Sequence, residues 1–336
     1  MQENENREKR LARIGHRKKL RRKRRIFWSF VTVLLVISAV LGNRAAAFRW
    51  GIQNTLDLMN RDNVTDLASI NEEMLKDTGV KNDDVVSFLL IGADKRASWK
   101  ESGRSDSCMI ATIDMKHNKL KLTSLMRDMY VEVPGYGKHK FNAAYSYGGV
   151  ELMYKTIVAN FGITVKGYVL VDFEAFKKVI DTLGGVDVKL TSDEYNYLMK
   201  AYHRTSVLKL KQGNNRMNGT QALAYCRIRQ DVKGDFGRTE RQRYVISQIL
   251  AAMKKEPLGK WYEMAEAVMP EMTTDMGTDA IFDYMKCVVL MGTTEFEQFR
   301  IPVDGSYTNE YAGKQEVLGV DLDANIKAYN KFINEE

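Results

Sequence analysis

Charged side chains are grouped around three short apolar runs in residues 87–130. The runs have the composition of strands, and the segments GADKR, GRSDS and LMRD follow or join them. The ionisable side chains that fall at or near these predicted strand ends are Asp94, Arg96, Arg104, Asp106 and Arg127. Arginines and carboxylates together are the groups that bind phosphate, either directly or through a divalent metal.

A second cluster, in residues 225–243, reads YCRIRQDVKGDFGRTERQR and contributes five more arginines. The planar guanidinium of arginine binds two phosphate oxygens at once, whereas lysine acts as a flexible point charge. We therefore expect the two clusters to meet in space and to bind a pyrophosphate. The carboxylates have two open roles at such a site. They pair with the arginines, or they hold a divalent metal on the phosphate.

The elements that position these clusters alternate between strands and helices. Strands are expected at residues 85–92, 107–114, 119–126, 167–173, 185–190 and 299–303, and helices at 150–162, 173–185, 219–229, 261–269, 281–291 and from 321. The segment DMKHN indicates an antiparallel hairpin between the second and third strands. The fold class is therefore α/β, a three-layer α/β/α domain with a central mixed β-sheet.

Two predicted helices carry the arginines of the second cluster. Asn218 begins the first as a good N-cap residue, and Arg227 and Arg229 lie at its end, where cations suit the helix dipole. In the second helix, Arg238 and Arg241 share a face with apolar residues one turn and more further on. Arginines at a helix start oppose the dipole. Either an anion or a salt bridge to one of the nearby acids, Asp231, Asp235 or Glu240, would offset that cost.

The N-terminal part of the chain has the pattern of a membrane anchor. Residues 1–25 hold 12 Lys and Arg against 3 Asp and Glu, and the seventeen residues 26–42 are uncharged. Seventeen helical residues reach about 25 Å, the short end for a membrane span. The positive-inside rule predicts a cytoplasmic tail (1–25), one transmembrane helix (26–42), an extracytoplasmic stalk (43–84) and an extracytoplasmic domain (85–336) in a single-pass cell-membrane protein.

A cleaved signal peptide is the competing interpretation of this segment. The apolar stretch is short, and Ala45, Ala46 and Ala47 resemble a cleavage site. Nucleic acid is not expected as the main partner, because the chain after residue 25 holds 39 Lys and Arg against 40 Asp and Glu. Nucleic-acid-binding domains usually carry a basic face instead.

The three cysteines, Cys108, Cys226 and Cys287, show no metal-binding spacing and form no disulfide framework. Cys108 and Cys226 lie beside the arginine motifs, but the four histidines offer no clear base for a catalytic thiol. Buried small hydrophobic side chains are the better interpretation.

The ordered motif series resembles that of the LytR-CpsA-Psr family. The series runs GADKR, GRSD, RD after a strand, KFNAAYSYGG and ALAYCRIRQDVKGDFGRTERQR, and it covers about residues 85–253. Members of this family are membrane-anchored phosphotransferases of Gram-positive cell walls. They move a glycopolymer from a polyprenyl pyrophosphate carrier onto peptidoglycan. The resemblance departs from the usual pattern at Ser107, Leu125, Met126 and Met129, none of which is charged.

The resemblance implies roles for individual residues of this chain. Asp94 and Asp106 would hold Mg²⁺ or Mn²⁺, with Arg96 as a supporting charge. Asp235 lies where the family places a candidate catalytic base, and Arg127 would act in both catalysis and binding. The residues expected to bind the pyrophosphate are Arg104, Arg127, Arg227, Arg229, Arg238 and Gln242.

Two alternatives to the transferase remain open. One is a membrane-anchored hydrolase that cleaves polyprenyl pyrophosphates with water as the acceptor. The other is a non-catalytic wall-polymer-binding or regulatory protein whose arginines hold teichoic acid. The polymer is open at this point: a teichoic acid, a capsular polysaccharide and another anionic glycan each fit the predicted site.

Overall fold

A computed structural model describes residues 49, 51, 53–62, 67, 70, 84–93, 105–202, 209–229, 234–256, 258–293 and 295–335. Residues 53–336 form one compact unit. No helix within the described ranges is both long enough and apolar enough to cross a membrane. The predicted tail and membrane span, residues 1–25 and 26–42, lie outside the described residues, as does most of the predicted stalk.

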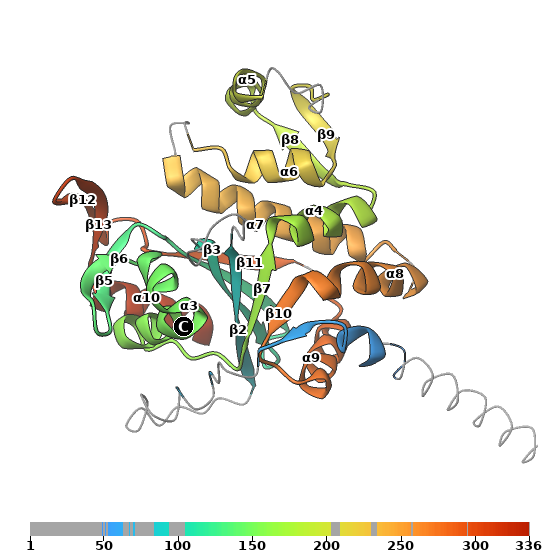
Figure 1. Cartoon of the computed structure of the whole chain (residues 1–336), viewed down its shortest axis with the longest axis horizontal. Helices are drawn as coiled ribbons and strands as arrows, with labels where there is room; N and C mark the ends of the chain where they lie inside the picture. The colour runs from blue at the N-terminus through green and yellow to red at the C-terminus, as the bar shows by residue number, and fades with distance from the viewer. Residues whose placement is uncertain are drawn as a thin grey trace, which may run out of the picture. The chain divides into compact units, whose positions relative to one another are not determined.

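A seven-stranded mixed sheet is the centre of the fold (Figure 1). Its strand order is β1 (Asn60–Arg61), β10 (Met272–Thr274), β7 (Tyr168–Asp172), β2 (Val85–Ala93), β3 (Ser105–Asp114), β4 (Lys119–Leu125) and β11 (Phe296–Ile301). β2 is parallel to β7, and β4 is parallel to β11. β3 is antiparallel to both β2 and β4, so the predicted mixed sheet and the predicted hairpin are confirmed.

The hairpin turn between β3 and β4 is closed by local side-chain chemistry. Asp114 accepts a hydrogen bond from the backbone N–H of His117 at 3.0 Å. Asn118 adopts the left-handed conformation with φ of 57°, which asparagine tolerates better than most residues. The segment DMKHN therefore reverses the chain as its composition predicts.

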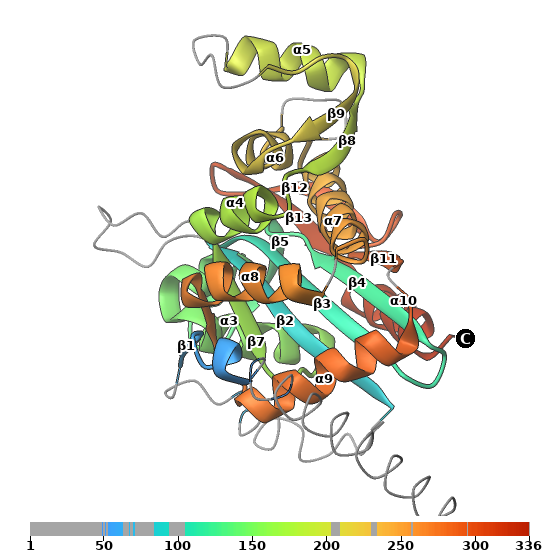
Figure 2. The ribbon, with the colours of Figure 1, turned by 90° about the vertical axis from the view of Figure 1, so that its right-hand side faces the viewer.

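Helices cover both faces of the sheet (Figure 2). Leu89 and Ile91 point to a core shared with α3 (Ala143–Phe161) and α10 (Leu322–Asn334), whereas Phe88 packs with α9 (Thr278–Met291) on the other face. This alternation follows the two-residue period of a strand. It explains why the β2 sequence is apolar at nearly every position, since both of its faces are covered.

Two smaller sheets complete the domain. β12 (Tyr307–Ala312), β13 (Gln315–Val320), β5 (Met129–Val133) and β6 (Gly137–Lys140) form a four-stranded sheet, which the sequence patterns did not predict. β8 (Val186–Leu190) is a strand as expected, but it pairs only with β9 (Gly213–Met217) in a separate ribbon. α5 (Ser192–Ala201) follows β8 in the chain.

The remaining helices agree with the sequence patterns apart from their ends. They are α4 (Phe173–Thr182), α6 (Gly219–Cys226), α7 (Gly234–Met253) and α8 (Leu258–Val268). Asn218 and Gln221 make both hydrogen bonds of a capping box at the start of α6. α3 is interrupted at Gly148 and Gly149, so its continuous part begins where the sequence predicted it, at Val150.

Candidate functional site

The candidate site lies at the edge of the sheet where the parallel strands end. Leu125, at the end of β4, pairs with Ile301 of β11, and Ala93, at the end of β2, pairs with Asp172 of β7. Ligands commonly bind beside the carboxyl ends of strands in open α/β sheets, because the chain there leaves the sheet and frees side chains and backbone groups. Arg127 and Asp128 come two and three residues after the end of β4, at this edge.

Four ion pairs connect the turn after β4, the strand β6 and the first turn of α7. Arg127 Nη2 lies 3.4 Å from Asp235 Oδ1, and Arg127 Nε lies 3.3 Å from Asp128 Oδ2. Arg238 Nη2 donates to Asp235 Oδ2 at 2.9 Å, and Lys140 Nζ donates to Asp128 Oδ1 at 2.8 Å. We call these five side chains the cationic cluster. Arg127 of the first cluster therefore meets Asp235 of the second, about a hundred residues later in the sequence.

The cationic cluster is partly shielded from solvent. Arg238 is 1% exposed, whereas the side chains of Arg127 and Asp235 are 21% and 18% exposed. Arg238, at the start of α7, pairs with Asp235 three residues earlier. Without a bound ligand, this salt bridge offsets the cost of a cation at the helix start. The half-exposed side of the cluster, formed by Arg127 and Lys140, is where an anion can approach.

The two carboxylates of the cluster differ in their pKa shifts. Burial disfavours the charged form of Asp128, but the hydrogen bond from Lys140 and the nearby Arg127 outweigh it, so the pKa of Asp128 is lowered. Burial raises the pKa of Asp235, and Arg238 and Arg127 offset only part of that effect. Asp128 is therefore a fixed counter-ion, whereas Asp235 is the carboxylate that is better placed to take up a proton.

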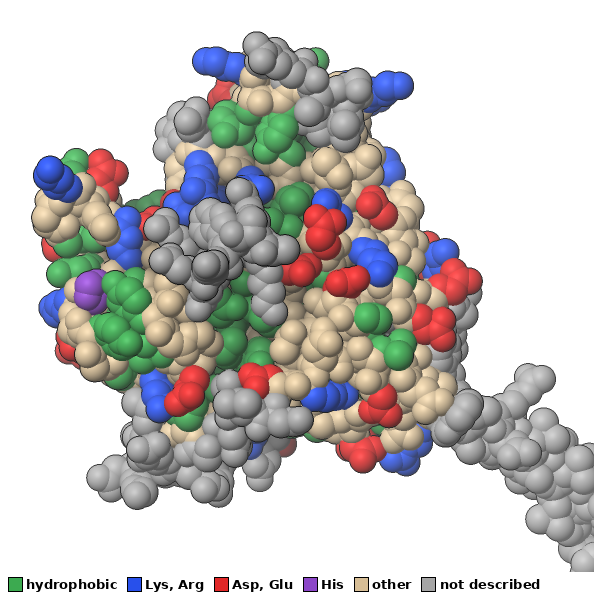
Figure 3. Space-filling view, in the orientation of Figure 1, with side chains coloured by type: hydrophobic (Ala, Val, Ile, Leu, Met, Phe, Trp, Pro, Cys, Tyr) green, Lys and Arg blue, Asp and Glu red, His purple; other side chains and the backbone are tan. Residues whose placement is uncertain are grey.

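Arg227 and Arg229 extend the positive surface toward the ends of β2 and β7. Both are exposed. The Arg227 guanidinium carbon lies 5.1 Å from the centre of the Phe173 ring, which directly follows β7. Arg229 acts on Asp235 electrostatically and opposes the rise of its pKa. Figure 3 shows Lys and Arg side chains on this face near α6 and near β6.

Gln242 lies one helical turn after Arg238 on α7. Its side-chain oxygen is buried and has no hydrogen-bond partner among the described residues. An amide oxygen accepts hydrogen bonds, so this atom suits a ligand group that donates one, such as a sugar hydroxyl. The structure thus places Arg127, Arg238, Asp235 and Gln242 together.

The other predicted site residues fall on or beside residues that the structure does not describe. Asp94, Arg96 and Arg104 lie outside the described residues, and for Asp106 only its place as the second residue of β3 is described. Ala93, which precedes Asp94 in the chain, pairs with Ser105, which precedes Asp106. The pairing of β2 and β3 shifts at Gly92, where a Cβ atom would lie 3.1 Å from that of Ser107.

Arg241 and Arg243 are buried like Arg238 but have structural partners. Arg241 Nε donates to Glu194 Oε1 of α5 at 2.8 Å, and its Nη1 donates to the backbone oxygen of Ile228 at 3.2 Å. Arg243 Nη1 donates to Ser124 Oγ at 2.8 Å. The shared face of Arg238 and Arg241 is confirmed as buried, yet Arg241 pairs with an acid that the sequence analysis did not consider.

Asp128 and Lys140 received no role in the sequence analysis. Both lie inside motifs that were noted there, the RD after a strand and the lysine before FNAAYSYGG. Asp128 and Lys140 are twelve residues apart, and no helix or strand predicted between them would bring their side chains together. The β5–β6 hairpin does so, because Tyr130 pairs with Lys140 in its register.

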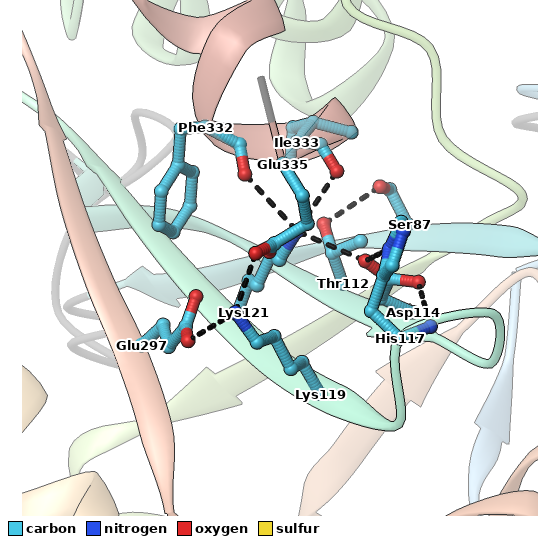
Figure 4. Close-up of polar contacts among 10 residues, drawn as sticks. All are labelled: Ser87, Thr112, Asp114, His117, Lys119, Lys121, Glu297, Phe332, Ile333 and Glu335. Carbon is cyan, nitrogen blue, oxygen red and sulfur yellow. Dashed lines mark hydrogen bonds and ion pairs between the residues drawn. The ribbon is translucent and has the colours of Figure 1, made fainter.

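A group with the geometry of a metal site lies at the other end of the β3–β4 hairpin (Figure 4). Asp114, His117 and Glu335 are the one such group among the described residues. Lys121 Nζ, which is fully buried, lies 2.9 Å from Asp114 Oδ2 and also pairs with Glu335. It donates to the backbone oxygens of Phe332 and Ile333 at the end of α10. The ammonium group supplies the positive charge that these acids need, so we assign no metal here.

The cysteines near the arginine motifs are buried, as predicted. Burial raises the pKa of the Cys226 thiol to about 12 and raises that of Cys108 still further. Neither thiol ionises in the neutral range, so neither is a nucleophile. Cys287 is only half-buried.

Comparison with protein families and curated proteins gives consistent matches. The LytR_cpsA_psr family model matches residues 52–330. Regulatory protein MsrR of Staphylococcus aureus (strain COL) is 34% identical over 265 residues, which cover 76% of this chain and 77% of the relative. Polyisoprenyl-teichoic acid–peptidoglycan teichoic acid transferase TagU of Bacillus anthracis (strain CDC 684 / NRRL 3495) is 35% identical over 233 residues, 67% of this chain and 72% of that protein.

Solved structures share this fold. TagT bound to LI-WTA superposes with a TM-score of 0.63 at 25% identity, over 78% of this chain and 94% of that one. TagV of B. subtilis superposes with a TM-score of 0.61 at 27% identity, over 76% and 98% of the two chains. The mixed α/β architecture predicted from the sequence is therefore that of these proteins.

Proposed function

The chain belongs to the LytR-CpsA-Psr family, as its motif series predicts, and we propose that it transfers an anionic glycopolymer from a polyprenyl pyrophosphate carrier to peptidoglycan. The observation that carries the proposal is the cationic cluster, in which Arg127 and Arg238 share Asp235 at the carboxyl edge of the sheet. The name of TagU and the ligand of TagT support a teichoic acid as the polymer, with a capsular polysaccharide as the other anionic candidate.

The reaction follows from the charges of the site. A hydroxyl oxygen of the acceptor attacks the phosphorus that carries the glycan, and the bridging P–O bond of the pyrophosphate breaks. Polyprenyl monophosphate leaves. Negative charge on the phosphate oxygens opposes this attack until cations neutralise it. Arg127, Arg238, Arg227, Arg229 and Arg104 are proposed to supply that charge, and Gln242 a hydrogen bond.

Asp235 is proposed to accept the proton of the attacking hydroxyl. It is half-buried, its pKa is raised by burial, and it touches both cluster arginines. A carboxylate of higher pKa is a stronger base at neutral pH, provided that it remains ionised. A pyrophosphate that binds Arg127 and Arg238 would also draw these arginines away from Asp235, which raises its basicity further.

Asp235→Asn is expected to lower the transfer rate by about 100-fold or more, because general-base catalysis contributes about 10²–10⁴-fold. Binding of the lipid is expected to remain.

In the wild-type protein, the transfer rate is expected to fall as the pH drops through the raised pKa of Asp235, because the protonated acid accepts no proton. The variant is expected to lose this acidic limb. The pH dependence of single-turnover rates measures both effects, and simultaneous loss of lipid binding would assign Asp235 a structural role.

Asp94 and Asp106 are proposed to hold Mg²⁺ or Mn²⁺ on the pyrophosphate. Asp128 and Asp235 already have cationic partners, so they are less available as ligands. The pairing of Ala93 with Ser105 supports the proposal, because each of these acids directly follows one of the two paired residues in the chain. Two carboxylates together with phosphate oxygens suit Mg²⁺. When bound, the metal would neutralise phosphate charge.

The variant Asp94→Ala/Asp106→Ala is expected to remove the Mg²⁺ dependence of pyrophosphate binding. Isothermal titration of pyrophosphate, with Mg²⁺ and with EDTA, measures it. Asp84→Ala is a matched control, because this acid lies at the other end of β2. If the double variant still binds pyrophosphate more tightly with Mg²⁺, the two acids are not the metal ligands.

The topology is proposed on the sequence pattern alone. The basic residues 1–25 and the uncharged residues 26–42 favour a single-pass protein with its N-terminus in the cytoplasm and its domain outside. This orientation would place the cationic cluster on the side of the membrane where peptidoglycan lies. Peptidoglycan and the membrane-borne lipid are then both within reach.

A direct assay tests the proposed function. The piece from about residue 44 onward is incubated with Mg²⁺, a synthetic polyprenyl pyrophosphate glycan and peptidoglycan oligomers, and the products are followed by mass spectrometry. A glycan joined to peptidoglycan through one phosphate, with polyprenyl monophosphate released, is the expected result. Phosphoglycan without an acceptor would indicate a hydrolase. Bound lipid without turnover would indicate a binding or regulatory protein.

A further inference from the structure

Two tyrosines form an exposed aromatic stack on the small sheet beside the candidate site. Tyr136 and Tyr147 are 52% and 42% exposed, and their ring centres lie 4.7 Å apart with an interplanar angle of 16°. The ring centres of His139 and Tyr147 lie 5.3 Å apart with an interplanar angle of 84°, and the Tyr147 hydroxyl lies 3.4 Å from His139 Nδ1. We call these three side chains the aromatic platform. Figure 3 shows a histidine with hydrophobic side chains beside it over β5 and β6.

The backbone holds the outer ring of the platform in place. Tyr136 is at the tip of the β5–β6 hairpin between Gly135 and Gly137, which have φ of 82° and 75°. Its N–H donates to the backbone oxygen of Val133 at 2.9 Å, which closes the turn. Only glycine adopts such φ values readily, so these two glycines fix the turn that exposes the Tyr136 ring. Tyr147 ends the short helical turn before the break at Gly148.

The platform is connected to the cationic cluster through β6. His139 and Lys140 are adjacent on this strand and point to its opposite faces, and Lys140 donates to Asp128 of the cluster. Tyr136 and Lys140 are four residues apart, about 13 Å along an extended chain. This distance is too great for contact with a pyrophosphate held by Arg127. It suits a group that is attached to the pyrophosphate, or that approaches it, through one or more sugar units.

We propose that the aromatic platform binds a sugar ring of a glycan. The two faces of Tyr136 differ, since one stacks on Tyr147 and the other is left to solvent. Exposed apolar side chains that are grouped into a patch, as these stacked rings are, can mark a ligand-binding site. The C–H face of a pyranose ring is flat and apolar enough to stack on it, while its hydroxyls can bond with His139 of the platform. The inference rests on the proposed function, which supplies glycans as the ligand class.

Both the donor polymer and the peptidoglycan acceptor contain such rings, and the full chain in detergent can distinguish them. Tyr136→Ala is expected to raise KM about two- to twelvefold for the glycan whose ring it holds, because an aromatic contact contributes about 0.5–1.5 kcal/mol and about 1.4 kcal/mol corresponds to tenfold. Tyr136→Trp is expected to restore the original KM, since an aromatic ring is still available for stacking. The kcat at saturation is expected to stay constant. A rise for peptidoglycan fragments assigns the platform to the acceptor, and a rise for the lipid-linked polymer assigns it to the donor.

Tyr311→Ala is the matched control, because Tyr311 is 72% exposed and lies on the separate β12–β13 hairpin. Saturation-transfer NMR with peptidoglycan fragments and with free polymer measures binding without turnover. It therefore tests the platform even if the protein transfers nothing. Loss of ring contacts in Tyr136→Ala but not in Tyr311→Ala supports the proposal. Equal KM values and equal NMR contacts in these two variants and the unchanged protein would overturn it.

Discussion

Arg127→Met is expected to lower kcat/KM for transfer by about 100- to 1,000-fold, the usual cost of removing one positioned group that stabilises transition-state charge. Arg127 is the half-exposed arginine of the cationic cluster, and it contacts Asp128 and Asp235. It therefore lies where an incoming phosphate can displace these carboxylates. Single-turnover rates with a lipid-linked glycan measure the effect.

The fold is expected to survive this change. Asp235 keeps its hydrogen bond to Arg238, and Asp128 keeps its hydrogen bond to Lys140, so no buried carboxylate is left alone. Arg127→Lys is expected to recover only part of the rate, because an ammonium lacks the two-pronged geometry of a guanidinium. Arg216→Met on the β8–β9 ribbon is the control for losing an arginine. A rate for Arg127→Met within twofold of that control would remove Arg127 from the mechanism.

Lys121→Met is expected to lower the free energy of unfolding by about 3–5 kcal/mol, because it leaves a buried acid without its cation. Lys121 and Asp114 both have fully buried side chains. The same ammonium group also donates to the backbone oxygens of Phe332 and Ile333 (Figure 4). It thereby caps the C-terminal end of α10. Urea unfolding curves measure the loss.

Lys119→Met is the matched control, two residues away on the same strand. Lys119 pairs with Glu297 and Glu335, but its side chain is 35% exposed. Exposed pairs contribute about 0–1 kcal/mol. Equal losses in the two variants would mean that burial of the Lys121 pair has no special importance for stability.

The pH dependence of stability offers a second measure of the same pair. Burial opposes ionisation of Asp114, but hydrogen bonds from the His117 backbone and from Lys121 outweigh it, so the pKa is lowered on folding. The stabilisation is therefore complete above the unfolded value of about 3.9 and is lost as the pH falls through the lower folded value. Lys121→Met is expected to weaken this acid-side loss.

Local patterns determined several features of this protein. A two-residue apolar period and turn residues were enough for the β3–β4 hairpin, and Asn218 with Gln221 was enough for the start of α6. Helical spacing was enough to bury Arg238 and Arg241 on one face. The motif series was enough for the family. These features depend on residues that are near one another in sequence, so short-range physical rules describe them.

Only the tertiary structure decided which partners those side chains meet. Arg238 pairs with Asp235 in the cationic cluster, whereas Arg241, three residues later, pairs with Glu194 of α5. Helical period assigns both to one face, but it carries no information on what packs against that face. The same holds for Lys121, which sits in a predicted strand but caps a helix more than two hundred residues later. A buried ion requires a partner, and where that partner comes from a distant segment, as for Arg241 and Lys121, only long-range packing brings it into place.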